Sequence, residues 1–73
     1  MTGWDALRTV AAYARYQERC AEFYYAAASR ARKQGDASTA AAMRTLGVSS
    51  DGAAAGARNS AKDVLRALRE AGL

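Results

Sequence analysis

The stretch VAAYARYQERCAEFYYAAASRARK, residues 10–33, combines alanine, aromatic and charged residues without a single proline or glycine. Alanine is the best helix former because it loses no side-chain entropy, whereas proline interrupts helices. The same composition extends over the whole chain, in which alanine occupies 20 of 73 positions and proline none. The sequence therefore predicts an all-α fold.

Local capping signals place the first helix at residues 5–34. Thr2 followed by Asp5 matches a capping box, in which the hydroxyl accepts a hydrogen bond from a backbone amide left free at the helix start. Gly35 then supplies a residue able to adopt the left-handed conformation that often ends a helix. This helix is long for so short a chain.

Two further helices are predicted after the first. Asp36 is a good N-cap for a helix at residues 37–46, and Gly47 is expected to end it. A last helix is expected at residues 51–71, ended by Gly72. The chain is thus divided by glycine into a long, a short and a medium helix.

The predicted fold is a single small three-helix domain covering residues 1–73. Its long N-terminal helix forms an antiparallel hairpin with the C-terminal helix, and the short middle helix is a cross-piece. Domains of this size bury little surface, so they usually add a disulfide, a metal or a partner chain. One cysteine excludes an internal disulfide, and the absence of histidine argues against zinc. We therefore expect the chain to associate with itself or with another protein.

Apolar side chains of the first predicted helix cover an arc of about 200°, wider than the roughly 100° needed to pack on one neighbour. Part of this arc is aromatic. Aromatic residues at helical spacing are typical of a core, but tyrosine also favours contact surfaces because it has an apolar body and a polar tip. The predicted protein interface consists of Leu7, Tyr13, Tyr16, Cys20, Phe23 and Tyr24.

A formal net charge of +4 supports a second hypothesis, nucleic-acid binding, although basic residues also serve simply as a solvated helix face. The segment AMRTLGVSS, residues 42–50, resembles the turn of a helix-turn-helix DNA-binding motif, where a glycine permits the turn and a serine caps the next helix. This resemblance implies a small DNA-binding regulator. The candidate nucleic-acid contacts are Arg30, Arg32, Lys33, Arg44, Ser50 and Arg58.

The residues that carry most enzyme chemistry are missing. No histidine is available to activate Cys20, and neither a glycine-rich phosphate loop nor a metal-binding constellation occurs. We expect a protein that is not an enzyme and needs no cofactor. Without an 18-residue apolar stretch or a secretory leader, a cytoplasmic location away from membranes is expected. The favoured function is a module for protein interaction or self-assembly, such as a phage or bacterial accessory or structural protein.

Overall fold

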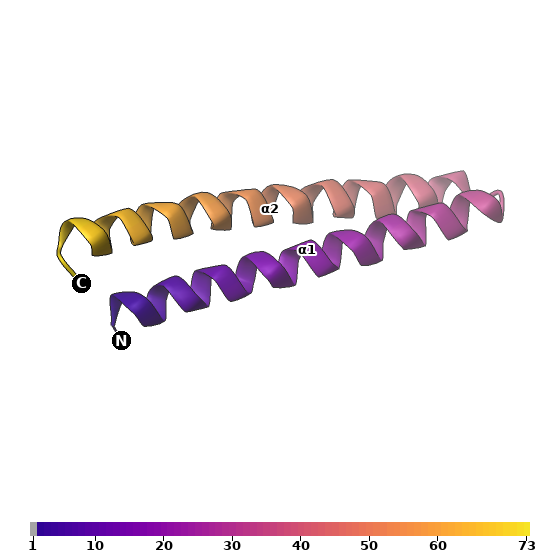
Figure 1. The fold of residues 1–73 in the computed structure, drawn as a ribbon. Helices are drawn as coiled ribbons and strands as arrows, with labels where there is room; N and C mark the ends of the chain where they lie inside the picture. The colour runs from indigo at the N-terminus through magenta and orange to yellow at the C-terminus, as the bar shows by residue number, and fades with distance from the viewer. Residues whose placement is uncertain (1) are drawn as a thin grey trace.

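The computed structural model describes residues 2–73 and consists of two long helices joined by a short turn. Helix α1 spans Gly3–Lys33 and helix α2 spans Ala37–Glu70. The helices lie antiparallel along a rod of 56 × 14 × 13 Å, with both chain termini at one end (Figure 1). We call this the open end and the opposite tip the turn end. The all-α prediction is confirmed.

Both helices begin at the cap residues that the sequence predicts. Thr2 Oγ1 accepts a hydrogen bond from the Asp5 backbone N–H at 3.1 Å, and the Asp5 carboxylate accepts one from the Thr2 N–H. Asp36 caps α2 by accepting a 3.0 Å hydrogen bond from the Thr39 backbone N–H. Between the helices, Gly35 has φ of 77°, where a side chain is strained. Local chemistry therefore sets both helix starts and the turn.

The predicted division of the second half of the chain is wrong. The helices expected at 37–46 and 51–71 are one uninterrupted helix, so the described chain has two helices where the sequence predicted three. The first helix, by contrast, lies within two residues of its predicted bounds of 5–34.

Gly47 explains the missing break. Its φ is not left-handed, unlike that of Gly35 and Gly72, so it does not act as a helix terminator. Instead it is buried beneath the ring of Tyr25, and a Cβ at this position would lie 2.7 Å from a ring carbon. Gly47 therefore makes room for an aromatic side chain of α1 while α2 continues past it.

The seam between the helices is built from small residues at heptad spacing. On α1 the buried positions recur every seven residues, at Ala14, Ala21 and Ala28. On α2 the buried residues are Ala40, Gly47, Ser50, Ala54, Ala57 and Leu68. Spacings of three, four and seven are typical of coiled coils, and small side chains allow helix axes to approach to about 8 Å. The core is consequently thin, and no large side chain of the described residues is fully buried.

Candidate interaction surface

The large aromatic side chains of α1 lie outside the seam. Tyr13, Tyr16 and Phe23 expose 49%, 60% and 63% of their surface. Phe23 also meets Tyr24 edge to face, with ring centroids 5.7 Å apart and an interplanar angle of 72°. Together these rings form an aromatic row along α1 that α2 does not cover.

The aromatic row belongs to one long side of the rod, which we call the uncharged flank. On α1 it is formed by the heptad positions beside the seam, and α2 adds its small residues on the same side. The uncharged flank comprises Thr9, Tyr13, Tyr16, Cys20, Phe23, Tyr24 and Ala27 of α1 and Leu46, Ser49, Ala53, Gly56 and Ser60 of α2. These residues include no Lys, Arg, Asp or Glu, although Arg19 lines one edge of the flank, and Arg30, Asp63 and Glu70 follow at the same heptad positions beyond its ends.

Two open hollows lie on the uncharged flank. One, of about 530 Å³, lies between the helices where Thr9 and Tyr13 of α1 face Ala53, Gly56 and Ser60 of α2. The second, of about 290 Å³, is lined by the aromatic row around Cys20. Because small residues of α2 sit beside large rings of α1, the flank offers both projections and recesses to a partner.

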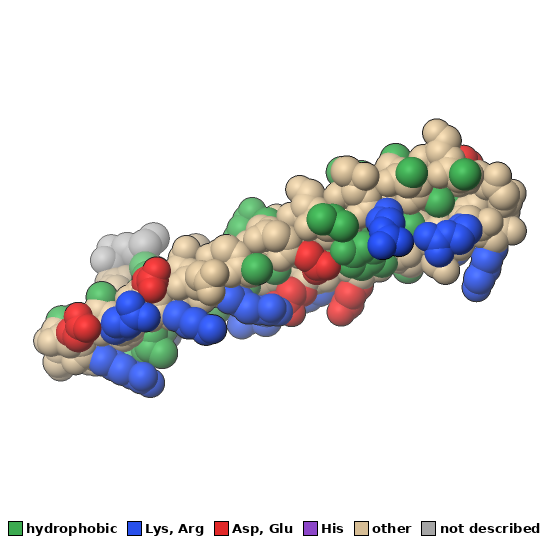
Figure 2. All heavy atoms as spheres, turned by 90° about the horizontal axis from the view of Figure 1, so that it is seen from above, with side chains coloured by type: hydrophobic (Ala, Val, Ile, Leu, Met, Phe, Trp, Pro, Cys, Tyr) green, Lys and Arg blue, Asp and Glu red, His purple; other side chains and the backbone are tan. Residues whose placement is uncertain are grey.

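The opposite side of the rod, the charged flank, links the two helices by polar contacts. Arg58 of α2 forms an ion pair with Glu18 of α1. The Tyr25 hydroxyl donates a 2.8 Å hydrogen bond to Asp51, and this bond raises the pKa of Tyr25 above its ordinary value of 10.0. In Figure 2, blue and red side chains follow one long edge of the rod, whereas green and tan atoms dominate the other edge over its middle.

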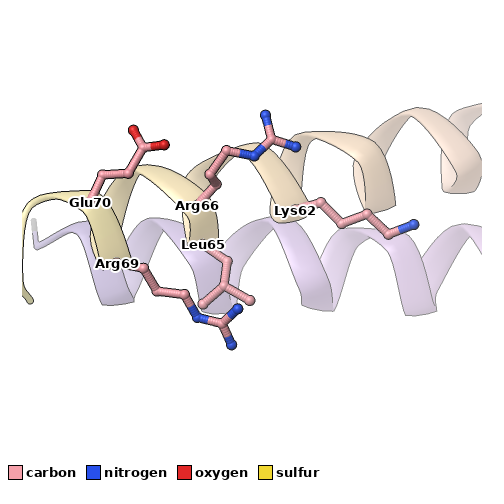
Figure 3. A pocket seen from close by; sticks show the side chains of 5 residues that line it. All are labelled: Lys62, Leu65, Arg66, Arg69 and Glu70. Atoms are coloured by element: carbon pink, nitrogen blue, oxygen red, sulfur yellow. The ribbon is translucent and has the colours of Figure 1, made fainter.

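A hollow of about 370 Å³ near the open end is lined by Lys62, Leu65, Arg66, Arg69 and Glu70. Figure 3 shows that these cations do not converge, because Arg66 points away from α1 while Arg69 reaches over it. Convergent donors are what an anion site requires. The hollow is therefore an uneven part of a solvated surface rather than a binding site for phosphate.

Five of the six residues predicted as a protein interface lie together on the uncharged flank. They are Tyr13, Tyr16, Cys20, Phe23 and Tyr24. Leu7 is the exception, because it lies one heptad before Ala14 and is half-buried at the seam. The interface role of the five residues stays a prediction.

The candidate nucleic-acid contacts are dispersed. Ser50 is buried in the seam with 8% of its surface exposed, and Arg58 is paired on the charged flank. Only the remaining four, Arg30, Arg32, Lys33 and Arg44, gather near the turn end, where all are exposed. The turn that resembled a helix-turn-helix motif is absent from the described chain, because residues 42–50 lie inside α2.

The α2 half of the uncharged flank escaped prediction. The predicted turn at residues 42–50 contains Leu46 and Ser49, so it does not indicate that they lie beside α1. The signal that reveals it is the spacing of small residues, seven from Ala40 to Gly47 and then three and four through Ser50 to Ala54. A glycine that fits this spacing belongs to the seam.

Other kinds of site find little support. Residues 2–73 hold no group of three or more side chains suited to a metal ion, and Cys20 is a free, half-buried thiol. Neither α1 nor α2 is long and apolar enough to cross a membrane. The chain matches no known protein family, no curated protein and no solved structure. The inference of a function therefore rests on the geometry and chemistry of the surface.

Proposed function

We propose that this protein is a non-enzymatic helical interaction module, which binds another protein surface or a further copy of itself through the uncharged flank. The observation that carries this proposal is that small apolar side chains are buried while large aromatic ones are exposed. Among residues 2–73, the buried apolar residues are seven alanines and one leucine, whereas Tyr13, Tyr16 and Phe23 are about half exposed or more. Large exposed apolar surfaces on small proteins commonly mark contact sites.

Because the seam is thin, covering the uncharged flank should also increase the stability of the fold. Apolar burial contributes roughly 25 cal/mol per Å², and alanine offers the least apolar area of any side chain used in a seam. A hairpin held by alanines therefore gains little from its own core. Covering the aromatic row would add the burial that the hairpin lacks, so binding and stability are expected to rise together.

The chemistry of the flank favours a protein partner. It is uncharged, it is rich in tyrosine, and it is long and straight because two helices form it. Tyrosine and phenylalanine are enriched in protein interfaces, where charged residues are depleted. The hollow beside Tyr13 is suited to the side chains of another helix, which pack as ridges into grooves.

A second candidate, nucleic-acid contact, rests on the turn end. Arg30, Arg32, Lys33 and Arg44 gather there, with Asp36 as the only nearby carboxylate. Contacts from such a cluster would involve phosphates and would weaken steeply as salt rises. A gel shift with duplex DNA at about 50 mM salt tests it, and no shift there would exclude it.

Site-specific photo-crosslinking in the cells that make the protein tests the main proposal. A photoreactive amino acid in place of Phe23 is expected to give defined covalent protein adducts. Val48 is the matched control, because it is apolar and 58% exposed but shares its side of α2 with Lys62 and Arg69. Equal labelling from both positions, or none from position 23, would overturn the proposal.

A further inference from the structure

Resting on the function proposed above, we infer that the partner on the uncharged flank is a second copy of the chain, lying antiparallel to the first. Two hairpins would then form a four-helix assembly with the aromatic rows at its centre. The occupant and its orientation follow from three features of the rod: the spacing of the rings, the placement of charge and the length of the flank.

The aromatic row is suited to a two-fold axis. Tyr16 and Phe23 lie one heptad apart on the same side of α1, and the midpoint between them falls at Arg19 and Cys20. When a second α1 crosses this midpoint in the opposite direction, Tyr16 of each copy lies level with Phe23 of the other. A symmetric dimer contact repeats every pairing twice, so one favourable ring pair becomes two.

Charge selects the antiparallel orientation. The turn end holds Arg30, Arg32, Lys33 and Arg44 against one carboxylate, Asp36. Two copies with their turns at the same tip would bring both cationic clusters together. In the antiparallel arrangement, each cluster instead lies level with the other copy's open end, where the carboxylates of Asp5, Asp63 and Glu70 offset three of the four cations Arg8, Lys62, Arg66 and Arg69. Like charges repel, so this orientation is favoured.

The available area suffices for a stable pair. The uncharged flank runs from Thr9 to Ala27 on α1, about 27 Å at 1.5 Å per residue, and two helices with side chains are roughly 20 Å wide, so overlap of the two flanks covers on the order of 500 Å² of each copy. The total of roughly 1,000 Å² meets the lower bound for a specific interface. Arg19 is the charged residue nearest the proposed axis, and its exposed side chain keeps its charge in solvent, so most of this area is favourable to bury.

Sedimentation equilibrium of the purified chain tests the identity of the partner. A dimer of twice the 7.7 kDa chain mass is expected at micromolar concentration. Phe23→Arg places two like charges in the contact and is expected to raise the dimer Kd by roughly 100-fold or more. Val48→Arg adds the same charge on the charged flank and is expected to change Kd by less than about threefold.

Circular dichroism at each concentration guards against misreading an unfolded variant. A Phe23→Arg chain whose helicity recovers at high concentration supports the pairing, because folding is then coupled to association. Equal Kd values for Phe23→Arg and Val48→Arg would overturn it.

Spin-label distances test the orientation. The native Cys20 lies at the midpoint of the aromatic row, so its two labels are expected to be close in the dimer. Labels at Thr9→Cys or at Ala27→Cys, each in a Cys20→Ser chain, are expected to be separated by roughly 30 Å and 20 Å along the rod, at 1.5 Å per residue from the midpoint. A parallel pair would instead give one common distance at all three positions.

The outcomes separate this inference from the proposed function. If the purified chain stays monomeric at about 100 μM while position 23 still cross-links a different protein in cells, the dimer inference is wrong but the proposed function as an interaction module stands. A monomeric chain with no specific cross-link from position 23 overturns both.

Discussion

The two flanks of the rod are formed by the same two helices, but the contacts between those helices differ from one flank to the other. On the charged flank, side chains cross from α1 to α2, through the pairs Glu18–Arg58 and Tyr25–Asp51. On the uncharged flank no hydrogen bond or ion pair joins the described helices, and a hollow lies between them. The comparison teaches that the hairpin fixes its register on one side and leaves the other side available for contacts outside itself.

Overfilling the seam below both flanks should give the largest effect. Ala54 exposes only 2% of its surface, so Ala54→Leu is expected to force the helices apart and lower the free energy of unfolding by about 2–3 kcal/mol. Ala55→Leu, one residue along on the exposed side, should be nearly neutral because leucine and alanine are both good helix formers. Urea unfolding measures both changes. Equal stability of the two variants would show that the seam is not closely packed.

Substitutions at two glycines of α2 test the stability of the hairpin and its association separately. An added Cβ at Gly52 or Gly56 would have no atom within 4 Å, so either change to alanine should raise the free energy of unfolding by about 0.5–1 kcal/mol. Gly56 lines the hollow on the uncharged flank, whereas Gly52 does not. Only Gly56→Ala should therefore weaken association, as measured by sedimentation. Unchanged association would remove the α2 half of the flank from the contact.

Removing the ion pair on the charged flank should change the free energy of unfolding by a smaller amount. Glu18 and Arg58 are both substantially solvent-exposed, so a double-mutant cycle with Glu18→Gln and Arg58→Gln should give a coupling energy of about 0.5 kcal/mol. Molar salt should reduce this coupling, because exposed charges are screened. The Asp63–Arg66 pair within α2 is the control, since it does not join the helices. A coupling that salt leaves unchanged would show that the cross-helix contact is not mainly electrostatic.

Alkaline pH should produce the smallest effect on the charged flank. The hydrogen bond to Asp51 raises the pKa of Tyr25, so this bond stabilises the fold fully below pH 10.0 and is lost as pH rises through the higher folded-state pKa. Tyr25→Phe should lower Tm at pH 7, and its difference from the parent chain should shrink at higher pH. Tyr24→Phe serves as the control on the other flank. A pH-independent difference would show that the hydrogen bond to Asp51 does not carry the effect, because phenylalanine keeps the ring over Gly47.

Sequence reasoning succeeded where the structure depends on neighbours along the chain. The Thr2–Asp5 capping box, the Asp36 cap and the left-handed Gly35 all depend on residues within one turn of each other. Gly47 failed as a predicted helix end because its role depends on Tyr25, which lies 22 residues earlier in the chain. A glycine that ends a helix and one that receives a ring look alike until the facing helix is known.

The wide apolar arc of the first helix posed the same difficulty. Both halves of the arc are apolar, and hydrophobicity alone would place the larger rings of Tyr16 and Phe23 inward. The structure turns the alanine half inward instead, since Ala14 and Ala21 allow close approach over many turns. Five of the six candidate interface residues therefore lie on the exposed half, and Leu7 belongs to the seam.

The position of the chain ends makes the two tips of the paired rod equivalent. In one hairpin both termini emerge at the same tip, beyond the open ends of α1 and α2 (Figure 1). In an antiparallel pair the two sets of termini point in opposite directions, tens of ångströms apart. Any domain or tag fused to the chain would thus be held away from its counterpart, and the assembly would work as a rigid spacer between two cargoes.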